Sequence, residues 1–410
     1  MQSPLKNIRV LDLTNVLAGP FCGQQLAHLG AEVIKIETPG IGDLARKLGA
    51  DEALNAVNMG ASFLAQNIGK QSLTINLKTP DGKTLFKELV SSADVVVENF
   101  RPGVMERLDL SYDTLSQINP SIIYCAISGF GQDGPMHELP AYDQIIQGLS
   151  GIMDITGDED SGPYRVGYPI ADTVGGMTAA FAIAACLAGR AMHHHPNNKH
   201  AVEKTGSYID VSMLDSTLAT MGWVVSNFLT TGQPPKRMGN NNFTNSPSGT
   251  FKTGDGLLNI AANKQAQFEA VCHVIGRPEL IQQPEFADRY QRIQHRETLT
   301  TAIESALAEK SATEWQQALN KVGVPAGCVL SLPQTLALEQ IQHREFIRTF
   351  APVEPTGRTL QLAGTGYRID RQTTGANQPP PQLGQHNMTI LQSLGYTPQQ
   401  IEALTAQGVL

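Results

Sequence analysis

The chain has 410 residues, of which 41% are hydrophobic and 17% charged, a composition typical of a globular protein rather than a disordered or fibrous one. Its formal net charge of -8 argues against a protein that coats nucleic acid, which would carry an excess of positive charge. Five scattered cysteines indicate a reducing compartment and argue against a disulfide framework or a zinc site. No uninterrupted apolar run reaches the roughly 18 to 20 residues of a membrane span, so we expect a cytoplasmic protein without a membrane partner.

The first third of the chain predicts strands that alternate with helices. Short runs rich in β-branched residues indicate strands at residues 8–13, 32–37, 73–77, 95–97 and 122–127. Helices are predicted at residues 18–29, ended by Gly30, and at 80–90, capped by Thr79 with Pro80 at the first position. This alternation predicts a Rossmann-like parallel sheet with helices on both faces.

The rest of the chain indicates a second, smaller domain. Residues 172–188 predict a long helix rich in Ala, Gly and Thr, whose small side chains allow another backbone to come close. Residues 250–330 predict a strand pair turned by Gly254-Asp255-Gly256 and then amphipathic helices. Because the length exceeds one compact core, we expect a large α/β domain of residues 1–215 and 331–410 and a small α+β domain of residues 216–330.

The layout around the turn after the first strand suggests a nicotinamide site, but the residues of the turn argue against one. A strand, a turn and a helix at residues 10–29, with Glu37 ending the next strand, have the layout of a dinucleotide-binding unit. The turn at residues 17–23 lacks the three spaced glycines that seat a pyrophosphate. We therefore expect a scaffold turn that touches some other ligand.

Asp172 is the main candidate for chemistry. A short carboxylate before a helix is commonly an N-cap, and that structural role is one interpretation. The helix N-terminus would also favour the ionised, nucleophilic form. Gly175 and Gly176 weaken the first turn by about 1 kcal/mol each relative to alanine, which is explained if a ligand or a second chain must approach the cap.

Several polar groups follow predicted strands, where ligands of parallel sheets bind. Arg101 and Arg107 come after the strand at 95–97, and Lys78 follows another strand, so the three cations could meet phosphates, although single exposed arginines often only solubilise. A glycine-rich segment at residues 128–135 suggests a backbone-lined mouth. After it, Tyr142 and Asp143 are either pocket groups or turn residues.

The histidines at 193–195 and 200 lie in a polar loop with no accompanying cysteine or buried acid. We expect a solvated loop there and no metal site, and no role for residues 193–204 is evident. No catalytic triad, nucleophile elbow or Walker loop is present in the sequence.

Read together, these segments resemble the family III CoA-transferases, the family of formyl-CoA and carnitine CoA-transferases. The similar segments span nearly the whole chain and occur in the family's order at residues 10–14 with 17–20, 29–37, 42–43, 97–103, 128–135 and 383–386. The C-terminal half is similar to the glutarate-type branch at residues 252–256, 267–272 and 379–386.

The resemblance implies an interlocked-ring homodimer that uses coenzyme A as a substrate, with no tightly bound cofactor. It implies that Asp172 attacks the donor thioester, forming a mixed anhydride and then an aspartyl-CoA thioester that the acceptor carboxylate resolves. The positions that match family contacts to CoA are Leu17, Ala18, Lys78, Asn99, Phe100, Arg101, Arg107 and Tyr142. The acids are expected to be small dicarboxylates, with Arg46 or Arg165 suggested for the second carboxylate.

Two departures and two rival functions accompany the resemblance. Thr38 replaces a frequent family arginine near the adenosine end, and residues 240–247 replace the glycine-rich loop that shields the intermediate in formyl-CoA transferase. The first rival is an α-methylacyl-CoA racemase of the same superfamily, which needs a histidine where Tyr142 stands. The second is a CoA-binding protein without turnover, which would gain nothing from a carboxylate beside the thioester.

Overall fold

The computed structural model describes residues 3–193 and 206–410. The chain divides into two compact units, a large unit of residues 1–152, 165–233 and 340–410, and a small unit of residues 153–164 and 234–339. Residues 216–233, which the sequence analysis assigned to the small domain, belong to the large unit, whereas residues 153–164 and 331–339, assigned to the large domain, belong to the small unit.

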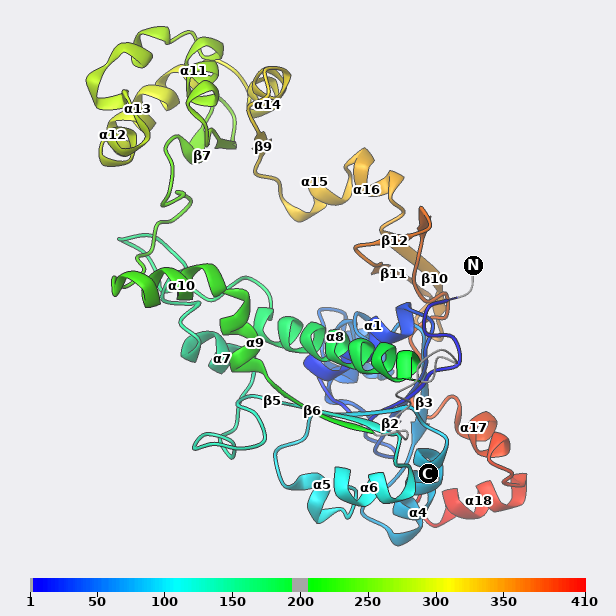
Figure 1. Cartoon of the computed structure of the whole chain (residues 1–410). Coiled ribbons are helices and arrows are strands. Elements are labelled where there is room, and N and C mark those ends of the chain that lie inside the picture. Colours follow the sequence, from blue (N-terminus) through cyan, green and yellow to red (C-terminus); the bar gives the residue numbers. More distant parts are fainter. Residues whose placement is uncertain (1–2, 194–205) are drawn as a thin grey trace. The chain divides into compact units, whose positions relative to one another are not determined.

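A six-stranded parallel sheet forms the centre of the large unit (Figure 1). In spatial order its strands are β3 (Lys70–Thr74), β2 (Glu32–Glu37), β1 (Arg9–Asp12), β4 (Val95–Glu98), β5 (Ile123–Ser128) and β6 (Ser207–Ser212). The predicted parallel α/β sheet is confirmed. Because the chain order reverses between β1 and β4, the crevice at their carboxyl ends is where such sheets bind ligands.

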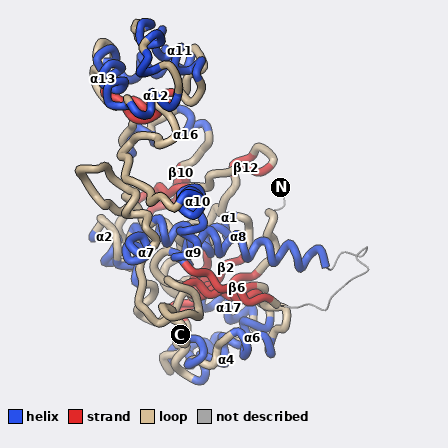
Figure 2. Tube along the Cα trace, turned by 60° about the vertical axis from the view of Figure 1, so that its left-hand side comes forward, coloured by secondary structure: helices blue, strands red, loops and turns tan. Residues whose placement is uncertain are grey.

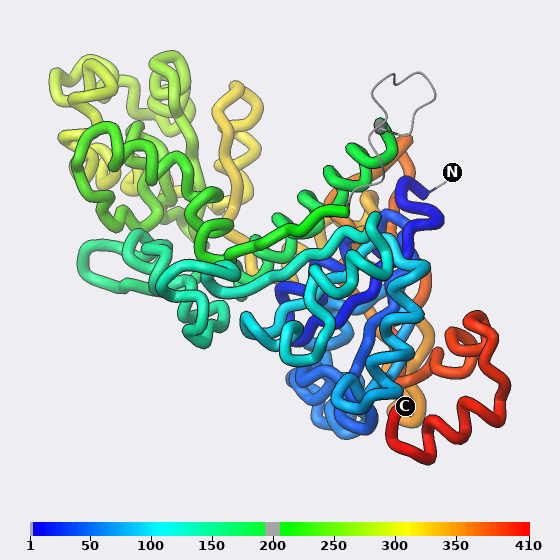
Figure 3. Tube along the Cα trace, turned by 60° about the horizontal axis from the view of Figure 1, so that its bottom comes forward, coloured from blue at the N-terminus to red at the C-terminus, as the bar shows by residue number. Residues whose placement is uncertain are grey.

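Helices cover both faces of this sheet (Figure 2). On one face, α1 (Ala18–His28) and α8 (Ile170–His193) pack against the strands. On the other lie α4 (Pro80–Ser91), α5 (Val104–Arg107) and α6 (Tyr112–Ile118), with α17 (Asn387–Ser393) and α18 (Pro398–Ala406) from the C-terminus beside them (Figure 3). Side chains from both ends of the sequence therefore share one core.

Shorter elements complete the large unit. They are η1 (Leu44–Lys47), α2 (Glu52–Ala56), α3 (Ala61–Leu64), α7 (Asp143–Leu149), α9 (Met213–Thr220), α10 (Gly222–Thr231), β10 (Ile347–Val353), β11 (Arg358–Ala363), β12 (Arg368–Ile369) and β13 (Gln372–Thr373). Helix α16 (Glu339–His343) spans the boundary between the units.

The two helices α1 and α8 approach each other closely. A Cβ added to Gly176 would lie 2.2 Å from the backbone oxygen of Ala18, so only glycine fits there. This contact fulfils the expectation that small residues let another backbone come near. By length and composition α8 is the one helix among the described residues that could span a membrane, yet Ala179, Ile183 and Leu187 pack into the core beside the sheet.

The small unit is an α+β structure with its own core. Strands β7 (Ser248–Lys252) and β8 (Leu257–Ala261) pair antiparallel as predicted, and β9 (Ala326–Cys328) adds to β8. Apolar side chains from the strands and helices bury one another. The helices are α11 (Gln265–Val274), η2 (Pro278–Gln282), η3 (Pro284–Phe286), α12 (Arg289–Gln294), α13 (Arg296–Leu307), α14 (Ala312–Lys321) and α15 (Leu332–Leu336).

Candidate active site

A cavity of about 230 Å³ lies in the large unit at the carboxyl ends of β1, β4 and β5, the position expected from the strand order. Three loops after these strands form much of its wall, and β5, α1, α8 and α9 contribute the rest. Its lining residues are Asn15, Val16, Leu17, Ala18, Asn99, Phe100, Arg101, Pro102, Ile127, Ser128, Gly129, His137, Leu139, Pro140, Ala141, Tyr142, Asp172 and Met213.

The cavity brings together most of the residues singled out in the sequence. Asp172 lies in its wall with Leu17, Ala18, Asn99, Phe100, Arg101 and Tyr142. Lys78 and Arg107 do not line it, although both are exposed in the same unit, Lys78 after β3 and Arg107 at the end of α5. The phosphate role suggested for these two cations therefore concerns a surface outside this cavity.

Asp172 lies inside the first turn of α8 and does not cap the helix, which corrects the N-cap interpretation. The helix begins at Ile170, two residues before Asp172. Its start is capped instead by Asp143, whose Oδ1 accepts the backbone N–H of Ala171 at 2.8 Å and that of Asp172 at 3.4 Å. Gln147 Nε2 donates to Asp143 Oδ2 at 2.7 Å, so the capping carboxylate is held from both sides.

Burial and, to a smaller extent, the nearby charge of Asp143 together raise the pKa of Asp172 to about 7. The direction of this shift is opposite to the ionised form that the sequence analysis expected at the helix N-terminus. A carboxyl group with this pKa is present in both protonation states near neutral pH. Such a perturbed group in a cavity is a candidate catalytic residue.

A side-chain clasp holds the loop after β1 against the loop after β4. Asn99 Oδ1 accepts the N–H of Asn15 at 2.8 Å, and Asn99 Nδ2 donates to the Asn15 carbonyl at 2.9 Å. The next residue, Val16, has φ of 69°, a strained conformation for a β-branched side chain. Its N–H donates to Asp43 Oδ1 at 3.0 Å, which holds that conformation in place.

Buried ion pairs beneath the cavity wall also hold the loop after β1 in place. Lys35 Nζ pairs with Asp43 Oδ2 at 2.9 Å and donates to the Thr14 carbonyl at 2.6 Å. Burial by itself would raise the pKa of Asp43, but Lys35 and two backbone N–H groups hold it below its usual range. Lys70 Nζ likewise pairs with Asp12 Oδ2 at 2.7 Å. These pairs fix the loop that carries Asn15 to Ala18.

Arg46 is not available to a substrate carboxylate, contrary to one of the two suggestions from the sequence. Its side chain is 0% exposed, and its Nε and Nη2 each bond Glu37 at 2.7 Å. The guanidinium also stacks on the Phe63 ring and donates to the Pro381 carbonyl. Arg165 is exposed but does not line the cavity.

The sequence analysis missed His137, which lines the same cavity as Asp172. Its Nδ1–H donates to the Gly134 carbonyl at 2.7 Å, so the ring is anchored by the glycine-rich segment just before it. The only signal was its place five residues before Tyr142. The cavity thus holds an imidazole as well as a carboxyl group.

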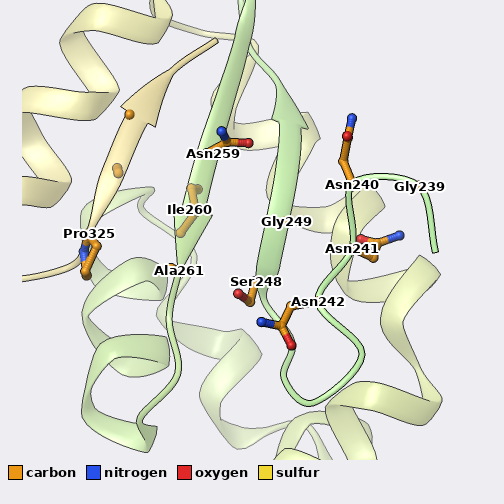
Figure 4. Close-up of a pocket in the computed structure, with 12 residues that line it drawn as sticks. Gly239, Asn240, Asn241, Asn242, Ser248, Gly249, Asn259, Ile260, Ala261 and Pro325 are labelled. Atoms are coloured by element: carbon orange, nitrogen blue, oxygen red, sulfur yellow. The ribbon is translucent and has the colours of Figure 1, made fainter. Parts of the chain in front are cut away.

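A larger cavity of about 520 Å³ lies within the small unit, between the loop at residues 239–242 and strands β7 to β9 (Figure 4). Asn240, Asn241 and Asn242 lie beside the strand of Gly249. None of its lining residues has a carboxyl, imidazole, amine or thiol group, so it can hydrogen-bond a ligand but supplies no general acid or base of ordinary pKa.

The metal interpretation of the histidines at 194, 195 and 200 falls outside the described residues. Within residues 3–193 and 206–410, no group of three or more His, Cys, Asp or Glu side chains could hold a metal ion.

The fold and the cavity together define an α/β protein with a titratable aspartate at the switch point of a parallel sheet. The model of CoA-transferase family III matches residues 5–387. The chain is 36% identical over 409 residues to the succinyl-CoA:glutarate CoA-transferase of Mus musculus, covering 99% of this chain and 90% of that one. It is 38% identical over 369 residues to the acetyl-CoA:oxalate CoA-transferase of Acetobacter aceti, covering 88% and 90%.

A solved structure supports the same family assignment. A CAIB/BAIF family protein from Brucella suis superposes with a TM-score of 0.81 at 32% identity, covering 96% of this chain and all of that one. The chain belongs to CoA-transferase family III, as the resemblance predicted. It is an enzyme that transfers coenzyme A between an acyl-CoA and a carboxylic acid.

Proposed function

We propose that this enzyme transfers CoA to a small dicarboxylate and that Asp172 is its covalent nucleophile. The observation that carries the nucleophile is a single acidic side chain in the wall of the switch-point cavity, with a pKa raised to about 7. The acceptor class is supported by the two relatives described above, which are named for glutarate and oxalate, both dicarboxylates.

The proposed reaction needs only groups that this chain and its substrates hold. The Asp172 carboxylate attacks the thioester carbonyl, the C–S bond breaks, and CoA leaves as a thiolate from a mixed anhydride. The thiolate then attacks the Asp172 carbonyl, which releases the donor acid and leaves an aspartyl-CoA thioester. The acceptor carboxylate repeats these two steps in reverse, so Asp172 ends as a free carboxylate.

The proposed CoA contacts divide into two groups. Leu17, Ala18, Asn99, Phe100, Arg101 and Tyr142 would contact the part of CoA near the thioester, because they share the cavity with Asp172. Lys78 and Arg107 are exposed outside it and would pair with phosphates at the far end. Asn99 would act mainly by holding the Asn15 loop, since its amide oxygen and nitrogen already bond that backbone.

A homodimer is also proposed. Large apolar side chains are exposed along α8 and α10, including Phe181 at 75% and Leu229 at 75%, with Met177 and Trp223 on the same helices. Exposed apolar side chains of this size on neighbouring turns of a helix are typical of a protein interface. The loop at residues 240–247 would take the place of the family's shielding loop and shape the acyl site with asparagine side chains.

Substitution and trapping test the nucleophile together. Asp172→Asn should still bind CoA but lose transfer by at least about 10³-fold, because an amide cannot form the anhydride. Enzyme incubated with acyl-CoA and then hydroxylamine should carry a hydroxamate at Asp172 by peptide mass spectrometry. Asp160→Asn, an exposed aspartate, is the control and should keep full activity. Turnover retained in Asp172→Asn, or labelling elsewhere, would rule the nucleophile out.

A panel of acceptors tests the substrate class. Glutarate, succinate and oxalate should give a higher kcat/KM than acetate, butyrate or formate with the same succinyl-CoA donor. Equal values for monocarboxylates and dicarboxylates would contradict the dicarboxylate assignment without affecting the nucleophile.

A racemase remains the second candidate, favoured by one observation. His137 lines the cavity with Asp172. Its imidazole supplies the second acid-base group that a racemase needs and that Tyr142 does not provide. Deuterium from D₂O entering the α-carbon of a 2-methylacyl-CoA without any acceptor acid would favour this function. Deuterium exchange that occurs only in the presence of an acceptor acid would not favour the racemase.

A further inference from the structure

A second cavity of the large unit, separate from Asp172, is lined by aromatic and acidic side chains. It measures about 260 Å³ and lies among β4, β5, β6 and the short helices α5 and α6, which cover the sheet face opposite α8 (Figure 1). We call it the tyrosine cavity. Its lining residues are Glu98, Arg101, Pro102, Gly103, Met105, Glu106, Ser111, Tyr112, Asp113, Tyr124, Gln132 and Tyr208.

Three tyrosine rings form one wall of the tyrosine cavity. The ring centroids of Tyr112, Tyr124 and Tyr208 lie 5.5 to 6.1 Å from one another. Tyrosine faces are electron-rich and attract organic cations. The packing of the three rings against each other holds their orientation, so the aromatic wall is preformed.

Glu98 is the buried acid of this cavity. It is 4% exposed, its Oε2 accepts the N–H of Phe100 at 2.7 Å, and its Oε1 has only a long contact of 3.5 Å from the Tyr124 hydroxyl. Within residues 3–193 and 206–410 no lysine or arginine forms an ion pair with it. A buried carboxyl group without a cation is costly when ionised.

The other charged groups around Glu98 do not neutralise the negative charge that it would carry when ionised. Glu106 and Asp113 also line the cavity, against the single cation Arg101, and Asp210 lies near enough to act on Glu98. This lining repels phosphates and carboxylates, so the tyrosine cavity is not an extension of an anion site.

We propose that the tyrosine cavity binds a small organic ammonium ion, with its charge between the Glu98 carboxylate and the tyrosine rings. Recognition of this kind uses an acid and aromatic faces together. A bare metal ion is not the expected ligand, because the acids of this cavity are not among any group in residues 3–193 and 206–410 that could hold one. The volume suits a cation of a few carbon atoms. Because Arg101 and Pro102 also line the cavity of Asp172, the two ligands would be neighbours.

Binding of a cation would release a proton from Glu98. Burial, together with the charges of Glu106 and Asp210, raises the pKa of Glu98 to about 8, so the empty site is mostly protonated at pH 7. An ammonium ion favours the carboxylate and lowers that pKa. Nearly one proton should therefore leave for each cation bound at pH 7.

Calorimetry on the full-length enzyme without CoA tests the proposal. Ethylammonium and tetramethylammonium are titrated at pH 7 in two buffers of different ionisation enthalpy, which measures the heat and the protons released. We expect one saturable site and proton release near one. Glu98→Gln should weaken binding by about tenfold or more and abolish the release. Glu159→Gln, an exposed acid of the small unit, should change neither.

A second variant keeps the test decisive if Glu98→Gln does not fold. Tyr112→Leu removes one ring and should weaken binding by about fivefold. Absence of saturable binding to the wild type, or affinity unchanged in both variants, would overturn the proposal. The measurement involves no turnover, so its failure would leave the proposed reaction untouched.

Discussion

Asp172 is held in an environment that opposes its charge. Its carboxyl group is partly buried in the cavity wall and lies near Asp143, which is itself fixed by the α8 backbone and by Gln147. The same Asp143 that orients the helix therefore raises the pKa of the residue that the helix presents. Position and reactivity of the proposed nucleophile depend on one capping interaction.

This environment predicts an acidic limb in the pH–rate profile. Only ionised Asp172 can attack, and with a pKa of about 7 about one tenth is ionised at pH 6. The value of kcat/KM should thus rise with pH through 7 and level off near pH 8. Asp143→Asn removes the like charge and should move the limb to lower pH, while Asp160→Asn should not move it. A profile flat from pH 5.5 to 8 would contradict the assignment.

The raised pKa also means that ionisation of Asp172 lowers the free energy of unfolding. The folded-state pKa lies above the unfolded value of about 3.8, so the folded chain binds the proton more tightly and stability falls as pH rises towards and through 7. Asp172→Asn cannot ionise and should raise Tm at pH 8 by about 1 to 3 °C. The gain should vanish at pH 4. Differential scanning calorimetry at both values checks this, and a lower Tm at pH 8 would indicate a structural aspartate instead.

At the scale of elements, the approach of α1 to α8 sets the geometry of the cavity. Gly176 touches the carbonyl of Ala18, and Ala18 and Leu17 line the cavity on the other side of that contact. The position of α1 relative to Asp172 thus depends on a missing side chain.

Gly176→Ala should destabilise the protein by about 1 to 3 kcal/mol and raise the KM for acyl-CoA, because the new Cβ pushes α1 away. Gly189→Ala in the same helix is the matched control. Nothing lies within 4 Å of its added Cβ, so it should stabilise the helix by about 0.5 to 1 kcal/mol and leave KM unchanged. Urea unfolding and steady-state kinetics measure both effects. A harmless Gly176→Ala would show that the contact can relax.

The elements that the sequence predicted well are those with a local signal. Strand runs such as residues 95–97 and the glycine crowding of α8 follow directly from residue type and period. Groups whose role depends on distant partners were not predictable. Asp143 caps a helix that begins 27 residues later, and Arg46 bonds Pro381 across nearly the whole chain. The sequence alone could not show that one arginine is buried with Glu37 while another is exposed.

At the scale of the whole molecule, the path of the chain between its units is the notable feature. The chain passes from one unit to the other after residues 152, 164, 233 and 339, and both its ends belong to the large unit. The small unit is therefore tethered on both sides by chain that starts and finishes elsewhere. We propose on this path, and on the resemblance to the family, that the homodimer is interlocked.

An interlocked dimer predicts that subunits do not exchange without unfolding. Two separately purified forms, one tagged with histidine and one with a streptavidin-binding peptide, should give no doubly tagged dimer after a day of mixing at native pH. The same pair should give about half mixed dimer after unfolding in guanidinium and refolding, because random pairing of equal amounts produces that fraction. Tandem affinity purification with native mass spectrometry measures both. Doubly tagged dimer formed under native conditions would mean that the subunits associate without being interlocked. A monomer at micromolar concentration would show that the exposed side chains of α8 and α10 are not an interface between copies.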